Sequence, residues 1–409
     1  MGAESNPDMT AGAEPLFDVA VIGGGIAGAG IARDAVLRGL SVALFEKNTF
    51  GSGTSSKSSK LIHGGIRYLD LAWQALLKAD FVEFWKNFRF VFLALRECRI
   101  LEATAPGLVK PIALVIPIYR SGGRGVLPVY LGTLLYSLLG IMTGSFRLPR
   151  ILWTPQAVLQ RVPGLKGEGL AGGVMIWDHT TDDLALVKAI LKSAEKSGAK
   201  IFERTAVSHY QFDAIRRIYE IKVKKGAEEK VYFAKKLINA AGPWVDKVRE
   251  ASGEKSEDFI VPVAGAHLMV KAFIEQSVIL QAEDNRLFFV IRIGDQCRVG
   301  TTERLHHDPD HVDASEDEVA YLLKELNRYF PSLDFKKEDI VSTDAGIRPL
   351  SRPGKGKSPH DISREHEIRL GPSGVIHVLG VKLTDHRRAA EEVVNLLNSG
   401  KTLTHCTPL

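Results

Sequence analysis

The chain has 409 residues, of which 45% are hydrophobic and 25% are charged, and its formal net charge is +5. This length supports two or three domains and a core that needs no disulfides. The composition excludes wholesale disorder and collagen-like repetition, and no Lys- and Arg-rich run interleaved with aromatic residues indicates a nucleic-acid-binding surface. A mild positive field suits an anionic substrate or an anionic lipid.

The spacing of cysteine and histidine indicates neither disulfides nor a metal site. Cys98, Cys297 and Cys406 are far apart and form no CxxC pair, which favours a reducing compartment. No HxxxH or HxxE spacing occurs with a matching carboxylate, so we expect no metal. Residues 1–15 lack the basic and apolar regions of a secretory signal. We therefore expect a cytoplasmic protein with a loose N-terminal lead-in.

A strand-helix-strand unit opens the ordered chain. The apolar strand at residues 18–22 ends in Gly23-x-Gly25-x-x-Gly28, an alanine-rich helix pattern follows, and a second strand leads to Glu46. This is the dinucleotide fingerprint: its glycines allow a tight turn, approach of the pyrophosphate and close helix packing. The helix N-terminus offers N–H donors to phosphate, and Glu46 can accept both ribose hydroxyls. The motif alone does not separate FAD from NAD.

A polar segment follows directly. Residues 51–60 (GSGTSSKSSK) hold five serines, one threonine and two lysines, and the next residues (LIHGGIRY) add His63, Arg67 and Tyr68. Such composition is usually a solvated loop. Its place beside the fingerprint favours a functional loop here.

The remaining patterns alternate between helix and strand. Helical periodicity covers residues 71–100, and an N-cap at residues 181–183 predicts a helix through Lys196. Alternating apolar residues predict an antiparallel sheet between about 258 and 303. The expected strands and the last strand-turn-helix unit are residues 200–207, 230–240, 287–293, 297–301 and 375–397.

Motifs along nearly the whole chain resemble one family. GGGIAGAGIARDAVLRGLSVALFEK followed by SGTSSKSSKLIHGGIRYLD is similar to the flavin-dependent glycerol-3-phosphate dehydrogenases, within the D-amino-acid-oxidase-like flavoproteins. The likeness continues in family order at INAAGPWVD, AGAHLMV, FFVIRIGDQCRVGTTE, DAGIRPL, DISREH and GVKLTDHR. This series is far more specific than the glycine fingerprint.

The resemblance implies an α/β fold, α+β overall, in which a Rossmann-type FAD-binding domain carries an inserted antiparallel-sheet substrate (cap) domain. We predict the FAD-binding domain at residues 16–75, 155–248 and 340–409, and the cap domain at 76–154 and 249–339. Non-covalent FAD contacts are implied at Gly23, Gly25, Ile26, Ala27, Gly28, Glu46, Lys47, Ser52, Thr54, Ser55, Ser56, Ser58, Lys60, Leu61, Val207, Ala241, Gly242, Trp244, Gly346, Gly380, Lys382, Leu383 and Thr384.

The resemblance also implies a pocket for a phosphorylated substrate. Catalytic roles fall on His63, His267, Arg348 and Lys382, and substrate binding falls on Arg67, Tyr68 and Arg364. Arg side chains bind phosphate oxygens bidentately, and oxidation of a secondary alcohol requires a base. His63 and His267 are both candidates for that base. Singly, each histidine or arginine is more often a structural residue.

Some positions depart from the family pattern. Val381 replaces a glycine, Asp385-His386 replaces Thr-Tyr, and Ala27 replaces an asparagine of the glycine loop. We expect Val381 to narrow the approach to the flavin and Asp385 to bring negative charge near an anionic substrate. Typical relatives continue into a helical C-terminal domain that these 409 residues do not include. These departures affect substrate identity more than FAD binding.

Residues 127–142 (LPVYLGTLLYSLLGIM) form a mostly apolar run between Arg120 and Arg124 on one side and Arg147 and Arg150 on the other. The run is shorter than the about 20 residues that span a bilayer. It fits an interfacial helix with arginines at the headgroups, or a buried core or cap helix. Because relatives pass electrons to membrane quinone, we favour peripheral attachment to the inner face of the cell membrane.

The resulting prediction is FAD-dependent oxidation of sn-glycerol 3-phosphate to dihydroxyacetone phosphate, with quinone as electron acceptor. A same-fold oxidase or dehydrogenase of a 2-hydroxy acid or amine is the first alternative. A flavin-binding subunit that has lost turnover is the second. The sequence assigns neither the acceptor, quinone or oxygen, nor the oligomeric state.

Overall fold

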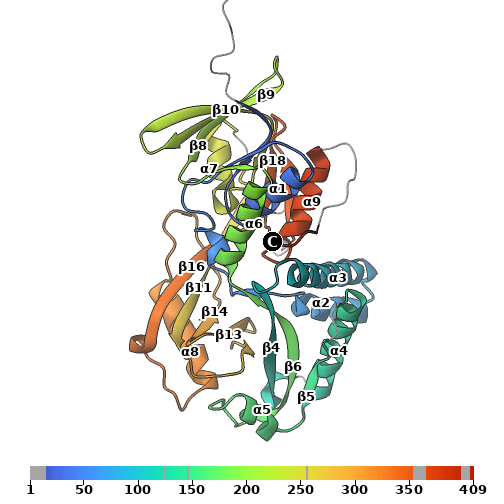
Figure 1. Cartoon of the computed structure of the whole chain (residues 1–409). Coiled ribbons are helices and arrows are strands. Elements are labelled where there is room, and N and C mark those ends of the chain that lie inside the picture. Colours follow the sequence, from blue (N-terminus) through green and yellow to red (C-terminus); the bar gives the residue numbers. More distant parts are fainter. Residues whose placement is uncertain (1–14, 124, 145–146, 255–256, 353–364, 398–405) are drawn as a thin grey trace, which may run out of the picture.

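The computed structural model describes residues 15–409 except 124, 145–146, 255–256, 353–364 and 398–405. Two sheets organise these residues, one in the upper and one in the lower part of Figure 1. The chain passes between the two sheets several times, so each is assembled from distant segments.

The first sheet has a parallel centre. Within the described residues its order is β17-β18-β10-β1-β2-β7, and β9 pairs with β10 and β8 with β9. Val21 of β1 lies beside Leu44 of β2 and Ile238 of β10. Burial on both faces explains the apolar runs of the central strands. The strands are β1 (Leu16–Ile22), β2 (Val42–Phe45), β7 (Lys200–Phe202), β8 (Ala206–Asp213), β9 (Ile218–Lys225), β10 (Glu228–Asn239), β17 (Glu367–Leu370) and β18 (Ile376–Leu379).

Three helices cover this sheet: α1 (Ile26–Leu37), α6 (Asp183–Lys196) and α9 (His386–Leu397). Their apolar faces meet in one core that includes Ile31, Leu186 and Val393. As the sequence predicts, the Asp182 side chain caps α6 by accepting from the Ala185 N–H at 3.0 Å. This cap satisfies a helix-end donor that would otherwise lack a partner.

The second sheet is mainly antiparallel. Its order is β15-β11-β14-β13-β12-β4-β6-β3, with β16 beside β11 and β5 beside β6. The strands are β3 (Leu61–Ile62), β4 (Val109–Tyr119), β5 (Arg150–Leu152), β6 (Leu170–Thr181), β11 (Ile260–Lys271), β12 (Val278–Gln281), β13 (Leu287–Ile293), β14 (Gln296–Gly300), β15 (Arg304–Leu305) and β16 (Ile340–Ser351). Strands β6 and β16 thus pair here although their residues fall in the segments predicted for the FAD-binding domain. The division into domains stays a prediction.

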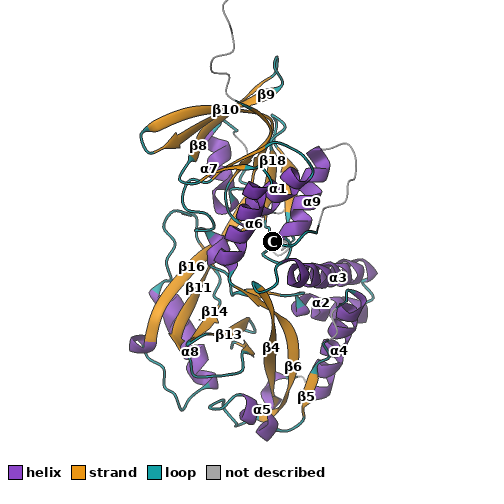
Figure 2. Ribbon diagram, in the orientation of Figure 1, coloured by secondary structure: helices purple, strands orange, loops and turns teal. Residues whose placement is uncertain are grey.

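Helices α5 (Pro155–Arg161) and α8 (Glu316–Tyr329) contribute to the core of the second sheet, where Val158 and Leu322 are buried. Helices α2 (Ile66–Leu77), α3 (Phe81–Thr104) and α4 (Val126–Met142) gather beside β4 and β6, as Figure 2 shows. The short helix α7 (Val245–Ala251) follows β10, a strand of the first sheet. Short 3-10 turns lie at Thr54–Ser56, Arg120–Gly122, Gly242–Trp244 and Lys337–Asp339.

Two elements differ from the sequence prediction. Residues 71–100 belong to two helices, because Ala79 adopts a left-handed conformation and Asp80 starts a new helix by accepting from the Glu83 N–H. The predicted strand at 200–207 is divided between β7 and β8, with left-handed Arg204 between them. In both cases a non-glycine residue with positive φ breaks the element, which periodicity alone does not predict.

The glycine turn between β1 and α1 requires glycine for steric reasons. A Cβ built on Gly28 would lie 1.9 Å from the Gly23 carbonyl oxygen, and a Cβ on Gly23, which has φ +106°, would lie 2.6 Å from the Ala240 carbonyl oxygen. These are backbone atoms, so a side chain there must displace β1, α1 or β10.

We therefore expect Gly28→Ala to lower the free energy of unfolding by roughly 2 kcal/mol or more, as overpacking does. Urea titration followed by circular dichroism measures this. Gly132→Ala, in α4 with nothing within 4 Å of the added Cβ, is the control and should leave stability equal or higher. Equal stability of the Gly28 variant and the control would contradict the steric argument.

Candidate functional site

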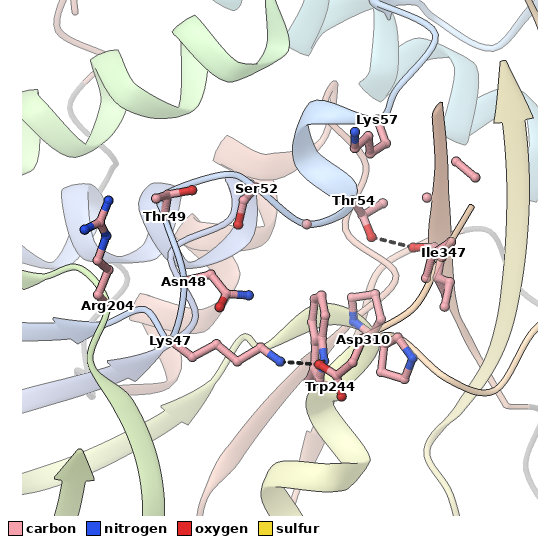
Figure 3. Close-up of a pocket in the computed structure, with 16 residues that line it drawn as sticks. Lys47, Asn48, Thr49, Ser52, Thr54, Lys57, Arg204, Trp244, Asp310 and Ile347 are labelled. Carbon is pink, nitrogen blue, oxygen red and sulfur yellow. Dashed lines mark hydrogen bonds and ion pairs between the residues drawn. The ribbon is translucent and has the colours of Figure 1, made fainter. Parts of the chain in front are cut away.

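A cavity of about 520 Å³ lies between the two sheets. It is lined by segments from the glycine-turn side (residues 47–57), from the 3-10 turn at Gly242–Trp244, from residues 309–312 and from β16, as Figure 3 shows. Five of the residues predicted to contact FAD line it: Lys47, Ser52, Thr54, Trp244 and Gly346.

The glycine turn and Glu46 form a dinucleotide cradle beside this cavity. The carboxylate of Glu46 accepts from the Gly24 N–H at 2.7 Å and from the Asn48 N–H at 2.8 Å. These contacts fix both carboxylate oxygens and leave each a lone pair for a ribose hydroxyl. The N-terminus of α1 begins at Ile26, after Gly25 in extended conformation. The geometry therefore fits the pyrophosphate and ribose of a dinucleotide.

The loop at residues 52–61 is bonded to its surroundings at several points. The Ser55 hydroxyl accepts from the Ile26 N–H at 2.9 Å, at the same helix end. Thr54 donates to the Ile347 carbonyl at 2.5 Å. Ser58 and Lys60 both bond to the buried carboxylate of Asp183. The last two side chains therefore anchor the loop to α6, while Thr54 lines the cavity and Ser55 bonds the start of α1.

At the mouth of the cavity, Asp310 connects three basic or aromatic side chains. Its carboxylate accepts from the Trp244 indole N–H at 2.7 Å and forms ion pairs with Lys47 at 2.6 Å and Lys247 at 2.7 Å. The Lys47 ammonium also lies 4.2 Å from the centre of a Trp244 ring. Figure 3 shows Lys47, Asp310 and Trp244 on one side of the cavity.

His63 and Lys382 form the first group of predicted catalytic residues. The His63 backbone N–H donates to the Thr384 hydroxyl at 3.2 Å, and its Nδ1 accepts from the Gly65 N–H at 3.0 Å. The Lys382 ammonium is 3.4 Å from the Tyr68 hydroxyl. Burial and the positive charge of Lys382 lower the pKa of His63 to about 4. The imidazole is therefore neutral at pH 7.

His267 belongs to a second, buried group. Its Nε2 is 3.0 Å from the Ser59 hydroxyl, and its Nδ1 is 3.0 Å from an Arg298 guanidinium nitrogen and 3.4 Å from Asp344 Oδ1. Arg298 can only donate, so the closer contact places a lone pair on Nδ1 and the proton on Nε2. Burial lowers the pKa of His267 to about 4, against the opposing effect of Asp344.

Arg348 lies next to this second group. Its guanidinium donates to the Thr301 hydroxyl at 3.0 Å and to the Thr302 carbonyl at 3.3 Å. Its positive charge contributes to the lowered pKa of His267. A Cβ on Gly265, in β11, would lie 2.7 Å from an Arg348 nitrogen. The absence of a side chain at this position of β11 therefore leaves space for the Arg348 guanidinium.

Two chain connections join the groups. Ser59 contacts His267, and four residues later His63 lies beside Lys382. A Cβ on Gly380 would lie 3.6 Å from the Pro349 carbonyl oxygen, so the turn before Lys382 touches the residue after Arg348. The structure thus brings all four predicted catalytic residues to the junction of the two sheets.

The other predicted contacts have varied surroundings. Val207 pairs with Val223 and packs against a core cluster. The Ala241 N–H donates to the Asn239 side chain, and Gly242 and Gly380 have positive φ. Leu61 is buried in β3, the Leu383 carbonyl accepts from His386, and the Ser56 hydroxyl lies 3.3 Å from the Gly53 carbonyl. Ala27 packs on the core of α1. Arg364 and the Arg67 side chain lie outside the described part of the structure.

Asp385 does not bring a free negative charge to the site. Its carboxylate forms ion pairs with His366 and with Arg388 at 2.6 Å. Burial alone would lower the pKa of His366, but hydrogen bonds to Asp385 and Glu392 raise it to about 9. Val381 packs against the core of the first sheet. The expectation that Asp385 opposes an anionic substrate is therefore not supported by its pairing.

The sequence interpretation did not single out Arg298, Asp344 and Ser59. Arg298 donates to both carboxylate oxygens of Asp344, at 2.7 and 2.8 Å, and to the Ser58 carbonyl at 2.9 Å. Both charged residues lie inside motifs that carry the family resemblance, RVG and DAGIRPL. The available signal was an Arg and an Asp at inward-facing strand positions. Because buried charges are usually paired, these two residues could have been proposed as an ion pair.

Comparison with known proteins shows the family of the chain. The DAO family of FAD dependent oxidoreductases matches residues 18–384. The chain is 34% identical over 389 residues to the aerobic glycerol-3-phosphate dehydrogenase of Staphylococcus saprophyticus, covering 93% of this chain and 67% of that protein.

Solved structures of FAD-binding proteins are similar to this chain as well. The glycerol-3-phosphate dehydrogenase of Bacillus halodurans complexed with FAD is 29% identical, with a TM-score of 0.74, over 96% of this chain and 66% of that chain. The L-alpha-glycerophosphate oxidase of Mycoplasma pneumoniae with FAD bound, 18% identical, has a TM-score of 0.68 over 96% and 98% of the two chains, which shows the fold alone. The chain spans about two thirds of the length of the two dehydrogenases.

The family match covers most of the chain, and the glycine turn, Glu46 and the adjoining cavity fit the ligand that the family binds. The chain belongs to the DAO family of FAD dependent oxidoreductases, and its cofactor is FAD.

Proposed function

We propose that the protein oxidises sn-glycerol 3-phosphate at C2 to dihydroxyacetone phosphate, with non-covalently bound FAD, and passes the electrons to a quinone. One observation carries this proposal: His63 lies with Lys382 and His267 lies with Arg348, and the loop at residues 54–60, which also bonds the start of α1, leads from one pair to the other. The names of the relatives support the same substrate.

Cationic side chains would bind the phosphate. Arg348 lies on β16 with two contacts to residues 301–302, which hold its guanidinium plane in one orientation. A fixed guanidinium can bind two phosphate oxygens at once. Lys382 adds a point charge between the aromatic rings of Tyr68 and Phe90, 4.9 and 4.5 Å from their centres. Arg67 and Arg364 remain predicted members of this set.

His63 is the better candidate for the base. His267 has contacts at both ring nitrogens, whereas Nε2 of His63 has no hydrogen-bond partner among the described residues. Gly65 favours the tautomer in which Nε2 carries the proton and donates to the substrate hydroxyl. Proton acceptance at Nε2 requires the other tautomer, which forms when the contact between Gly65 and Nδ1 is released. We assign His267 to positioning Ser59.

When bound, FAD supplies the acceptor for the hydride that leaves the substrate carbon. The protein residues hold the substrate in place, exclude water and move the hydroxyl proton. The buried Arg298 and the half-buried Asp344 keep His267 and the loop at Ser58 fixed without themselves contacting the reacting atoms.

An exposed apolar surface supports attachment to a membrane that holds the quinone. On α4, Leu127, Leu131, Leu135, Leu138 and Met142 recur every three or four residues and are 39–73% exposed. Such a stripe faces solvent only at an interaction surface. The neighbouring helices α2 and α3 add further exposed side chains at Leu71, Trp73, Leu76, Phe81, Val82 and Trp85. In the described part of the chain, none of the helices combines the length and hydropathy needed to span a bilayer.

The substrate proposal is tested by adding glycerol 3-phosphate to the purified protein without oxygen. We expect loss of the oxidised-flavin absorbance, and none with lactate, 2-hydroxyglutarate or amino acids. Bleaching by one of these other compounds and not by the phosphate ester would select the same-fold alternatives. No bleaching by any of them would favour a subunit without turnover.

Arg348→Ala should raise KM for glycerol 3-phosphate or lower kcat/KM by about 100-fold, since one buried charge-assisted contact is worth roughly 2 to 3 kcal/mol. Its flavin content, measured by absorbance, should stay unchanged. Arg161→Ala, at the exposed end of α5, is the matched control and should alter neither. Parallel loss of flavin and activity in the Arg348 variant would make Arg348 a structural residue.

The pKa values of the histidines near the site and of His366 should differ widely. Because the pKa values of His63 and His267 are lowered to about 4, both should stay neutral down to pH 5, and the stability they contribute should fall as pH drops from 6.5 toward 4. The pKa of His366 is raised to about 9, so its contribution should be lost between pH 6.5 and 9. NMR of protein with ¹⁵N-labelled histidine, assigned with His→Gln variants, measures this. A midpoint near 6.5 for His63 would refute the neutral imidazole.

Flotation with vesicles that contain anionic lipid tests the apolar surface. We expect the protein to float with the vesicles, and Leu131→Asp with Leu138→Asp to weaken vesicle binding by about 100-fold or more, since burying each leucine is worth roughly 1.5 kcal/mol or more. Leu370→Asp, which changes an even more exposed leucine on β17, should leave flotation as in the unaltered protein. Absence of binding by the unaltered protein would rule out the attachment.

A further inference from the structure

We propose that Cys98, Asp178 and His179 form a binding site for a divalent transition-metal ion of the Zn²⁺ class. One ligand atom from each residue, the thiol sulfur, a carboxylate oxygen and a ring nitrogen, lies within 4.8 Å of the other two. The three side chains are only 2%, 5% and 5% exposed. The proposal is independent of the substrate.

The site joins elements that are far apart in the sequence. Cys98 lies in α3, whereas Asp178 and His179 are adjacent near the end of β6. No short spacing motif connects residues 98 and 178, so the sequence analysis, which expected no metal, had no pattern to find. Figure 1 shows α3 beside the upper ends of β4 and β6.

His179 has the environment of a metal ligand. Its Nε2 is 3.2 Å from Glu102 Oε2, and Glu102 is held in turn by ion pairs with Arg147 at 2.6 Å and Arg99 at 3.1 Å. Nδ1 is buried and has no hydrogen-bond partner among the described residues. A carboxylate that accepts one ring N–H leaves the other nitrogen with a lone pair, which is the usual arrangement behind a metal-bound histidine. Nδ1 is therefore the ligand atom that we assign.

The charges of the site fit a dication. Asp178 accepts from the Tyr136 hydroxyl at 3.1 Å and from the Gly64 N–H at 3.4 Å, and forms no ion pair with a lysine or arginine in the described parts of the chain. A buried carboxylate without a cationic partner is costly. A thiolate and a carboxylate together balance a charge of +2, and a neutral imidazole adds no charge. Zn²⁺ binds sulfur, nitrogen and oxygen ligands, and with three protein ligands a water would complete its tetrahedron.

The site would connect the metal to the turn that carries His63. Tyr136 donates to Asp178 and accepts from the Gly64 N–H at 2.8 Å, and Gly64 follows His63 directly. A metal bound to Asp178 would thereby fix α3, β6 and this turn against one another. We expect a stabilising role, since all three ligands are buried away from the cavity between the sheets.

Metal content of the FAD-loaded protein tests the proposal. Protein produced with Zn²⁺ in the medium is dialysed against EDTA and measured by plasma mass spectrometry, with flavin absorbance as the measure of folded protein. We expect about one zinc per chain, and a decrease of at least tenfold in Cys98→Ala and in His179→Gln. Cys297→Ala removes another buried free cysteine and should keep the zinc.

X-ray absorption at the zinc edge supplies a second, independent measurement. We expect one sulfur at about 2.3 Å and lighter ligands at about 2.0 to 2.2 Å, with the sulfur lost in Cys98→Ala. Substoichiometric zinc in the unaltered protein, or equal zinc in the Cys98, His179 and Cys297 variants, would overturn the proposal. Because His179→Gln keeps the size and polarity of the side chain, its flavin content distinguishes loss of metal from loss of fold.

Discussion

The loop at residues 54–60 is bonded to both sheets at once, and the geometry of the site depends on this double attachment. Toward the first sheet, Ser55 bonds the start of α1, and Lys60 pairs with the buried Asp183. Toward the second sheet, the Ser58 carbonyl accepts from Arg298 and the Ser59 hydroxyl contacts His267. Each contact is buried or half-buried, so breaking one leaves a polar group without a partner. The loop therefore holds the cradle and the candidate catalytic groups at a fixed separation.

The electrostatics of this junction favour binding of an anion without disabling the histidines. Lys382 lies near His63, and Arg298 and Arg348 lie near His267. Positive charges of this kind, together with burial, keep both imidazoles neutral. A neutral imidazole can exchange a proton with a hydroxyl, and the surrounding cations attract a phosphate dianion. Asp344 neutralises Arg298, and we assign Arg348 and Lys382 to the substrate.

Local sequence patterns predicted the elements around the cofactor well, because their causes are local. The glycine turn, the Asp182 cap of α6 and the hairpin between β13 and β14 follow from short-range sterics and hydrogen bonds. The break at Ala79 was missed, because a left-handed alanine has no compositional signal.

The site was predicted through family resemblance more than through spacing. His63 and Lys382 are 319 positions apart along the chain, and only the sheet topology brings them together. The pairing of Asp385 with His366 could not be read from the sequence, since it depends on how the start of α9 meets the residues before β17. For the same reason the partners Arg298 and Asp344, on β14 and β16, were recognised only in the folded chain.

The central claim is that these cations and imidazoles face a phosphorylated substrate at the flavin. A crystal structure of the FAD-bound protein, soaked anaerobically with glycerol 3-phosphate, tests it most directly. We predict phosphate oxygens within hydrogen-bond distance of Arg348 and Lys382, with the C2 hydroxyl at Nε2 of His63 and C2 facing flavin N5. Substrate bound elsewhere, or a flavin whose reactive face is turned away from His63, would contradict the account.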